Sequence, residues 1–336
     1  MAVMARRRWL AIGGALAAGL TAAYVLRRRA RRAANEPGAR LSPGSVDKEQ
    51  FLADERYVQE GLREADLDGR RARVFDRGAG HAIVFVPITS GLAVVYSRQL
   101  RAFAHTNRVL LYERDEKLEQ PVSVEARVQE LRKLLDHRGI ERAHVVGLAD
   151  AGAPTLLFGR LHPDRALSLT AINLGPRYRM PPYWLNERII MPLTERLPVE
   201  RVVPDAAIRI LVGRISSAGG GLSRQLTRHM VGQIRQPMRV HKFSMLPISR
   251  DHDTRTWAHT LAVPTLLIGR DDDPFAPVAE LEQLASALPD CRGLHILPDG
   301  GRYITYTWAD RVNDLLRDFF AATEESPSSQ MPAPAA

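Results

Sequence analysis

Short apolar runs rich in β-branched residues recur along the chain and predict strands covered on both faces. Amphipathic stretches separate these runs; residues 123–139, for example, repeat apolar side chains at helical spacing. Strand–helix alternation of this kind predicts an α/β fold, with a mostly parallel sheet and helices on both faces. The predicted strands are residues 81–87, 108–113, 143–149, 166–173, 264–269 and 293–298, and two further helices are expected at 276–289 and 308–320.

Two segments interrupt the alternation. The sequence around Asp68-Gly69 indicates a hairpin turn, which would add an antiparallel pair to the edge of the sheet. Residues 177–257 are rich in helical patterns and indicate an inserted cap. The expected organisation, in chain order, is a membrane anchor with basic flanks at 1–40, a linker and lead-in segment at 41–59, the α/β domain at 60–325 with its cap at about 177–257, and a disordered tail at 326–336.

Four stretches, in this order, resemble the α/β-hydrolase superfamily. "VQELRKLLDHRGIERAHVVG" resembles the helix and strand that lead to the family's nucleophile, and "GRLHPDRALSLTAINLGPR" resembles the helix and strand that follow. "VPTLLIGRDDDPFAP" is similar to the strand and loop that carry the catalytic acid. "LHILPDGGRYITYTWADRVNDLLRDF" is similar to the closing strand, histidine loop and last helix. The resemblance implies the α/β-hydrolase fold for most of the chain.

The resemblance places the family's nucleophile between Gly147 and Gly152. In the family a serine occupies the tip of a sharp strand-to-helix turn, written G-x-S-x-G. The ungapped match puts Ala149 at this nucleophile position. Alanine has no nucleophilic atom, so acyl-enzyme chemistry cannot start there. Asp150 is an alternative nucleophile, because D-A-G fits the D-x-G of members that use aspartate, although this shifts the turn by one residue.

The acid position implied by the resemblance still holds a carboxylate, whereas the base position no longer holds a histidine. Asp273 matches the catalytic acid best, and Asp272 is the alternative. Arg302 stands at the histidine position. Its guanidinium stays protonated and cannot accept a proton near neutral pH. A guanidinium can bond a carboxylate at two points, so we expect Arg302 and Asp273 to pair.

The loop after the strand at 81–87 also departs from the family. The usual His-Gly of the oxyanion-binding loop is replaced by Pro87-Ile88, and proline has no N–H to donate. Together these changes predict a membrane-anchored, non-catalytic protein with a ligand-binding or scaffold role. The alternative is an active hydrolase of ester or acyl substrates with a non-standard nucleophile such as Asp150. A small apolar or acyl ligand is the expected occupant in either case.

The N-terminal segment predicts a single-pass membrane helix. Eighteen uncharged residues, Trp9–Leu26, lie between two arginine clusters, and about 17–25 apolar residues suffice to span a bilayer. The larger arginine cluster follows the span, which favours a cytoplasmic globular part. An export signal is the alternative.

Charge and composition limit the remaining classes. Residues 1–40 and 177–257 each carry a net charge of +8 within a chain of +9, so anionic lipid headgroups are an expected partner of the cap. The basic segments match no nucleic-acid-binding pattern, and we expect no nucleic-acid partner. The single cysteine, Cys291, excludes an internal disulfide. The sequence predicts neither a metal site nor a cofactor.

Overall fold

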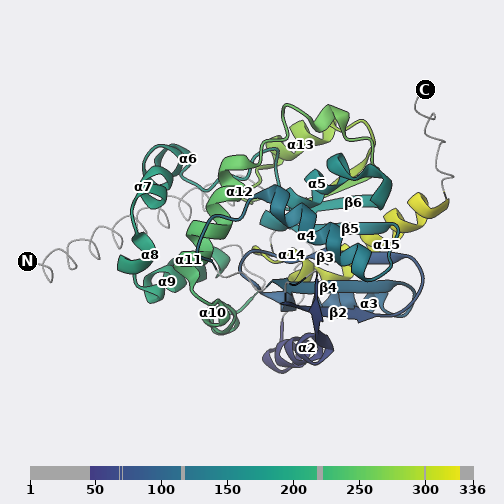
Figure 1. Cartoon of the computed structure of the whole chain (residues 1–336), viewed down its shortest axis with the longest axis horizontal. Coiled ribbons are helices and arrows are strands. Elements are labelled where there is room, and N and C mark those ends of the chain that lie inside the picture. Colours follow the sequence, from purple (N-terminus) through teal and green to yellow (C-terminus); the bar gives the residue numbers. More distant parts are fainter. Residues whose placement is uncertain are drawn as a thin grey trace, which may run out of the picture.

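A central sheet of eight strands organises the protein (Figure 1). The computed structural model describes residues 46–67, 69, 71–114, 118–217, 222–298 and 300–325. The strands are β1 (Leu62–Asp66), β2 (Arg71–Arg77), β3 (Ala82–Val86), β4 (Arg108–Arg114), β5 (Ala143–Leu148), β6 (Ala166–Ile172), β7 (Thr265–Arg270) and β8 (Cys291–Leu297). Their order in the sheet is β1-β2-β4-β3-β5-β6-β7-β8.

Strands β3 to β8 run parallel, whereas β2 pairs antiparallel with both β4 and β1. The prediction of a mostly parallel α/β sheet is therefore confirmed. Each predicted strand is present, and β3 and β5 are buried along their whole length, as continuous apolar runs require. The β1–β2 hairpin begins at the pair Asp66↔Arg71, close to the predicted turn.

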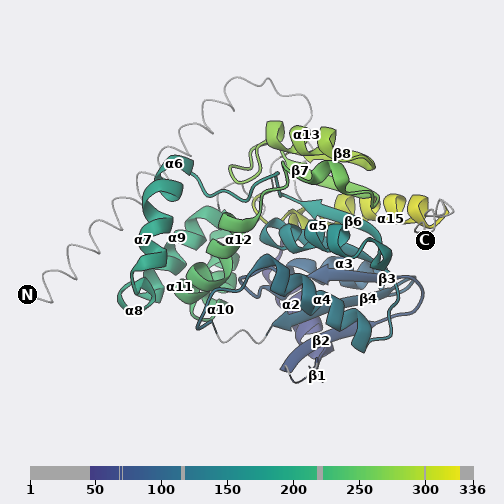
Figure 2. The same cartoon turned by 45° about the horizontal axis from the view of Figure 1, so that its top comes forward.

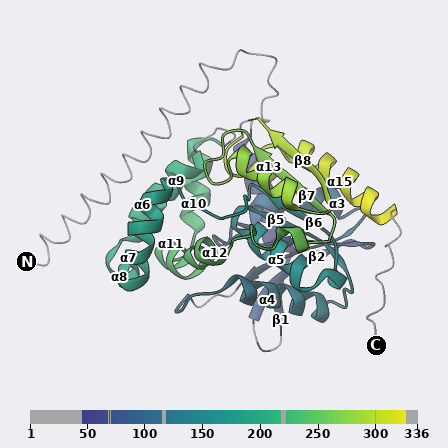
Figure 3. The ribbon, with the colours of Figure 1, turned by 90° about the horizontal axis from the view of Figure 1, so that it is seen from above.

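Helices cover both faces of the sheet (Figure 3). Helix α4 (Val124–His137) packs with α5 (Gly152–Leu161), which contacts β5 and β6. Helix α3 (Ser97–Phe103) packs with α15 (Ala309–Glu325), and these helices contact β4 and β6. Helix α13 (Val278–Ala287) lies on β7 and β8.

Not every helix was predicted from the sequence. Helix α2 (Lys48–Gly61) begins at Asp47, whose carboxylate accepts the N–H groups of Glu49 and Gln50 as an N-cap. Its buried Asp54 accepts a hydrogen bond from Tyr306 Oη at 2.9 Å and one from Arg101 Nε at 3.1 Å. These polar contacts fix α2 against the rest of the fold.

The segment between β6 and β7 is mostly helical and lies to one side of the sheet (Figure 2). Its elements are α6 (Tyr183–Leu185), the π-helix η4 (Asn186–Ile190), α7 (Met191–Arg196), α8 (Val199–Val202), α9 (Asp205–Ser217), α10 (Arg224–Gln233), α11 (Pro237–Val240), the π-helix η5 (His241–Met245) and α12 (Leu246–Asp251).

Across the part of the chain that the structure describes, no helix is both long and apolar enough to cross a membrane. The predicted membrane segment Trp9–Leu26 and the predicted tail at 326–336 lie outside the described residues.

Candidate active site

A sharp turn joins β5 to α5. It consists of the short 3₁₀ helix η2 (Ala149–Ala151), and Ala149 has a φ of +51°, in the left-handed region that non-glycine residues rarely adopt. Gly147 precedes the turn, and a Cβ there would overlap Ala151 O and Thr155 Oγ1. The backbone therefore keeps the strained geometry of a nucleophile turn although residue 149 carries only a methyl group.

The carboxylate of Asp150 lies directly beside this turn. It is buried, and its Oδ2 accepts the backbone N–H of Thr89 at 2.6 Å. Thr89 follows Pro87-Ile88 in the loop after β3, so this loop still presents an N–H to the site. No other described residue donates a hydrogen bond to Asp150, so Oδ1 has no donor within this part of the chain.

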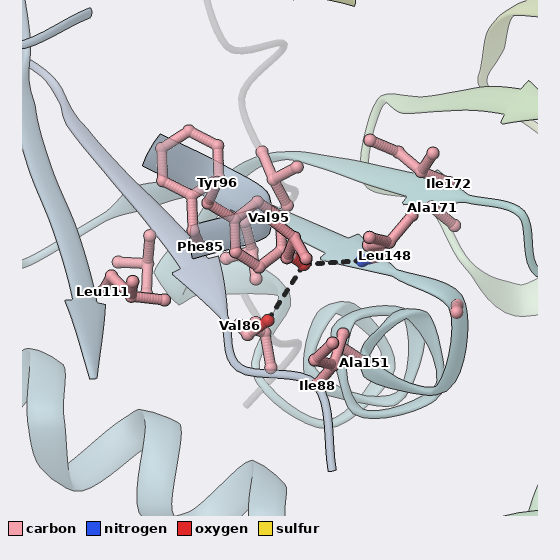
Figure 4. Close-up of a cluster of buried hydrophobic side chains, with 14 of the residues drawn as sticks. Phe85, Val86, Ile88, Val95, Tyr96, Leu111, Leu148, Ala151, Ala171 and Ile172 are labelled. Carbon is pink, nitrogen blue, oxygen red and sulfur yellow. Dashed lines mark hydrogen bonds between the residues drawn. The ribbon is translucent and has the colours of Figure 1, made fainter. Parts of the chain in front are cut away.

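Tyr96 connects β3 and β5, the strands that precede Thr89 and Asp150 (Figure 4). Its hydroxyl donates to Val86 O at 3.0 Å and accepts the N–H of Leu148 at 2.8 Å. Burial among apolar side chains raises the pKa of Tyr96 far above its ordinary value, so the hydroxyl remains a donor. The two bonds hold the last residue of β3 against the last residue of β5.

Arg302 lies in the loop between β8 and α14 (Ile304–Thr307). Its Nη2 donates to Tyr178 Oη at 2.8 Å, and its Cζ lies 4.4 Å from the ring centroid of Phe275. Burial opposes its charge, but the surrounding tyrosines and carboxylates outweigh burial and raise the pKa of Arg302. Arg302 therefore remains a cation and cannot serve as a base.

Asp273 lies in the loop after β7 and is buried. Its Oδ1 accepts the N–H of Phe275 at 2.9 Å and lies 3.6 Å from Arg270 Nη2. The expected ion pair between Arg302 and Asp273 is wrong, because Arg270 lies closer along the chain and takes that role. Arg270 also bonds Asp272, with 2.8 Å between Nη1 and Oδ1.

Charges from four loops act on one another at this edge of the sheet. Burial raises the pKa of Tyr178 to about 12; Arg302 opposes this shift, and Asp150 and Asp273 add to it. The residues concerned follow the carboxyl ends of β5, β6, β7 and β8, where open α/β sheets bind their ligands. The structure thus brings Asp150, Asp273 and Arg302 into one electrostatic neighbourhood, without a hydrogen bond between any two of them.

Comparisons with known proteins identify relatives of the chain, although no family model matches it. A Caulobacter protein provisionally named carbamate hydrolase RutD is 26% identical over 246 residues, which cover 69% of this chain and 87% of the relative. The poly(3-hydroxyalkanoate) depolymerase of Ectopseudomonas oleovorans is 25% identical over 189 residues, covering 56% of this chain and 64% of the relative. A 2-hydroxy-6-oxononadienedioate/2-hydroxy-6-oxononatrienedioate hydrolase of Comamonas testosteroni is 25% identical, covering 77% and 94%.

Solved structures share the fold. A thermophilic esterase from Thermogutta terrifontis superposes with a TM-score of 0.64 at 19% identity, over 78% of this chain and 98% of the esterase. The enol-lactonase of Burkholderia xenovorans LB400 superposes with a TM-score of 0.60 at 19% identity, over 77% and 100%. The chain belongs to the α/β-hydrolase superfamily.

The relatives correct one expectation about this α/β-hydrolase. The predicted membrane-anchored, non-catalytic ligand-binding or scaffold protein is contradicted, because the matched relatives are named as hydrolases or as a depolymerase. Alanine at position 149, arginine at position 302 and the altered loop at Pro87-Ile88 therefore do not establish a loss of hydrolase activity. At the turn, the structure places the carboxylate of Asp150, which accepts one N–H, that of Thr89, from the described residues.

Several site residues of this α/β-hydrolase carried no sequence signal. Thr89 contributes only its backbone N–H. Tyr178 bonds Arg302 and Arg270 lies near Asp273, and no sequence motif indicates either pair. Within the described ranges, no histidine hydrogen-bonds Asp150 or Asp273, and no group of side chains could hold a metal ion.

Proposed function

We propose that this α/β-hydrolase cleaves ester or acyl bonds with Asp150 as the nucleophile. The observation that carries the proposal is the buried carboxylate of Asp150, held through Oδ2 by Thr89 N–H while Oδ1 has no donor among the described residues. One oxygen is thereby oriented and the other is available to attack. The relatives named as hydrolases support the reaction class.

In the first step, Asp150 Oδ1 attacks the carbonyl carbon of the substrate. A bond forms between the carboxylate oxygen and the acyl carbon, and the bond to the leaving alcohol breaks, which gives a mixed anhydride. The leaving alkoxide takes a proton from water. The nearby guanidinium of Arg302, fixed by Tyr178 and Phe275, stabilises the negative charge that develops on the carbonyl oxygen.

In the second step, water attacks the anhydride. The bond to Asp150 breaks, the acid is released and the carboxylate is restored. An anhydride is more electrophilic than an ester, so this water needs less activation than attack on an ester requires. We assign Asp273 the role of accepting the proton of this water, since it is the other buried carboxylate in the electrostatic environment of Arg302. Asp273 then gives the proton to the hydroxide that remained when the alkoxide was protonated, which restores both carboxylates.

The test uses the full chain and p-nitrophenyl esters of short acids. Asp150→Asn keeps an oxygen that can accept the Thr89 N–H but removes the nucleophilic charge. We expect the rate to fall by about 100-fold or more. Asp272→Asn, which changes a carboxylate that pairs with Arg270, is the matched control and should retain most of the rate.

Two results would contradict the proposal. One is a wild-type rate no higher than that of the buffer on every ester. The other is an Asp150→Asn variant that is folded, by thermal melting, and as active as the wild type.

The N-terminal segment is a separate matter, because Trp9–Leu26 lies outside the described residues. Its membrane span, with the globular part in the cytoplasm, stays a prediction. Alkaline extraction of membranes from cells that express the full chain tests the span. Retention in the membrane pellet supports it, and release into the supernatant contradicts it.

A further inference from the structure

Large apolar side chains are exposed along the outer helices between β6 and β7. Six of them have between 42% and 65% of their surface exposed, which is unusual for a soluble surface when several lie close in sequence. They are Trp184, Ile189, Leu193, Leu197, Val202 and Ile210, on or next to α6, η4, α7, α8 and α9.

The first four share one helical face. Elements α6, η4 and α7 form a continuous helical stretch from Tyr183 to Arg196, with a π-helical turn in the middle. Trp184 and Ile189 are five residues apart across this π turn, and Leu193 and Leu197 follow at intervals of four. A π turn advances by i→i+5, so the wider first interval keeps the row aligned.

Unpaired arginines border this row. Arg188 and Arg196 are exposed, and neither forms an ion pair with a described residue. Arg188 follows Trp184 by four residues and Arg196 follows Leu193 by three, so both arginines lie beside the apolar row rather than in it. We call Trp184, Arg188, Ile189, Leu193, Arg196 and Leu197 the apolar–arginine face.

The neighbouring carboxylates bond to cations outside this face. Glu187 accepts a bond from Arg179 Nε at 2.6 Å, and this contact lowers the pKa of Glu187. Glu200 accepts from Lys242 Nζ at 2.8 Å, and this contact likewise lowers the pKa of Glu200. Glu195 Oε1 likewise lies 3.8 Å from Arg250 Nη1. Each of these three carboxylates thus has a cation outside the face, which leaves the face apolar and positive.

Helices α6, α7 and α8 lie at the edge of the molecule farthest from the sheet (Figures 2 and 3). The apolar–arginine face is thus carried by the layer most distant from β5 and the candidate active site. A large flat partner can approach this layer without first meeting the sheet.

We propose that the apolar–arginine face binds the surface of an anionic lipid bilayer. Tryptophan favours the boundary between headgroups and acyl chains, isoleucine and leucine insert apolar surface, and arginines pair with lipid phosphates. A second copy of this face would place arginines against arginines, and the arginine-flanked N-terminal segment would add to the same repulsion. The proposal does not depend on Asp150 or on any catalytic activity.

The test reads the environment of single positions in the full chain, because overall vesicle binding would also report the N-terminal segment. Cys291→Ser removes the only cysteine, and Leu193→Cys introduces a site for an environment-sensitive fluorophore. Leu161→Cys on α5 is the matched control, since Leu161 and Leu193 are each 45% exposed. Each labelled protein is mixed with phosphatidylcholine vesicles, with or without phosphatidylglycerol.

We expect the label at position 193 to brighten and shift to the blue only with phosphatidylglycerol, and to lose this response in high salt. The label at position 161 should not respond. Adding Arg188→Gln and Arg196→Gln should weaken the affinity at position 193 by about 30-fold, as two lipid-facing arginines require.

Three outcomes would overturn the proposal. The first is an equal response at positions 161 and 193. The second is a response at 193 that ignores phosphatidylglycerol. The third is a blue shift without vesicles that grows with protein concentration, which would identify a protein contact on this face.

Discussion

The two ends of strand β5 carry polar side chains in contrasting environments. At the amino end, His144 is fully buried; its Nδ1 lies 2.8 Å from Ser168 Oγ and its Nε2 lies 3.0 Å from Glu324 Oε1. Just beyond the carboxyl end, Asp150 is also buried but, among the residues that the structure describes, accepts the N–H of Thr89 alone. The difference indicates a structural role for His144 and a chemical role for Asp150. A histidine with both ring nitrogens bonded has no polar atom left for a substrate, whereas a carboxylate with one bonded oxygen has another oxygen available.

The largest expected effect on stability concerns the turn at the carboxyl end of β5. In Gly147→Ala, the new Cβ would overlap the backbone oxygen of Ala151, so the turn below Asp150 must shift. Overpacking of this kind should lower the free energy of unfolding by about 3 kcal/mol. Gly232→Ala in α10 is the control, since a Cβ there meets nothing within 4 Å. Chemical denaturation measures both variants, and equal stability would refute the tight turn.

His144, near the amino end of β5, should make the stability of the fold depend on pH in acid. Burial lowers the pKa of His144 from 6.5 to about 4, with Glu324 opposing the shift. The unfolded chain therefore binds a proton between pH 6.5 and 4 that the folded chain excludes, so stability is fully present above pH 6.5 and falls as the pH drops toward 4. The loss attributable to His144 is about 3 kcal/mol.

His144→Gln tests this sign. Its free energy of unfolding, measured by denaturation at several pH values, should depend less steeply on pH between 6.5 and 4. His252 is also buried, and burial lowers its pKa to about 4, so part of the slope should remain. If the free energy of unfolding of the variant depends on pH as steeply as that of the wild type, His144 does not cause the loss of stability in acid.

The smallest expected effect concerns the connection between β3 and β5. Tyr96→Phe leaves the N–H of Leu148 and the carbonyl of Val86 without their shared hydroxyl. We expect a loss of about 1–2 kcal/mol in the free energy of unfolding. If Tyr96 also positions Asp150 against Thr89, the kcat on p-nitrophenyl esters should fall more than KM changes. Unchanged stability and kcat would show that the hydroxyl holds neither strand.

The sequence predicted the parallel strands well, because buried strands of this fold are short apolar runs that stand out from their surroundings. It missed α2, whose residues are largely polar and whose start depends on the cap at Asp47. The contacts between side chains inside the site were harder to predict from the sequence. Arg270 displaced Arg302 as the partner of Asp273, and Thr89 meets Asp150 across 61 residues of sequence. Residue identity sets which groups are available, but packing decides which of them meet.

The most direct test of Asp150 as the nucleophile is chemical trapping during turnover. Borohydride reduces an activated aspartyl carbonyl to homoserine, whereas a free aspartate does not react. When the full chain is quenched with borohydride while it turns over an ester, peptide mass spectrometry should find homoserine at position 150 and only in the presence of ester. Steady ester turnover without any homoserine at position 150 would contradict the covalent role of Asp150.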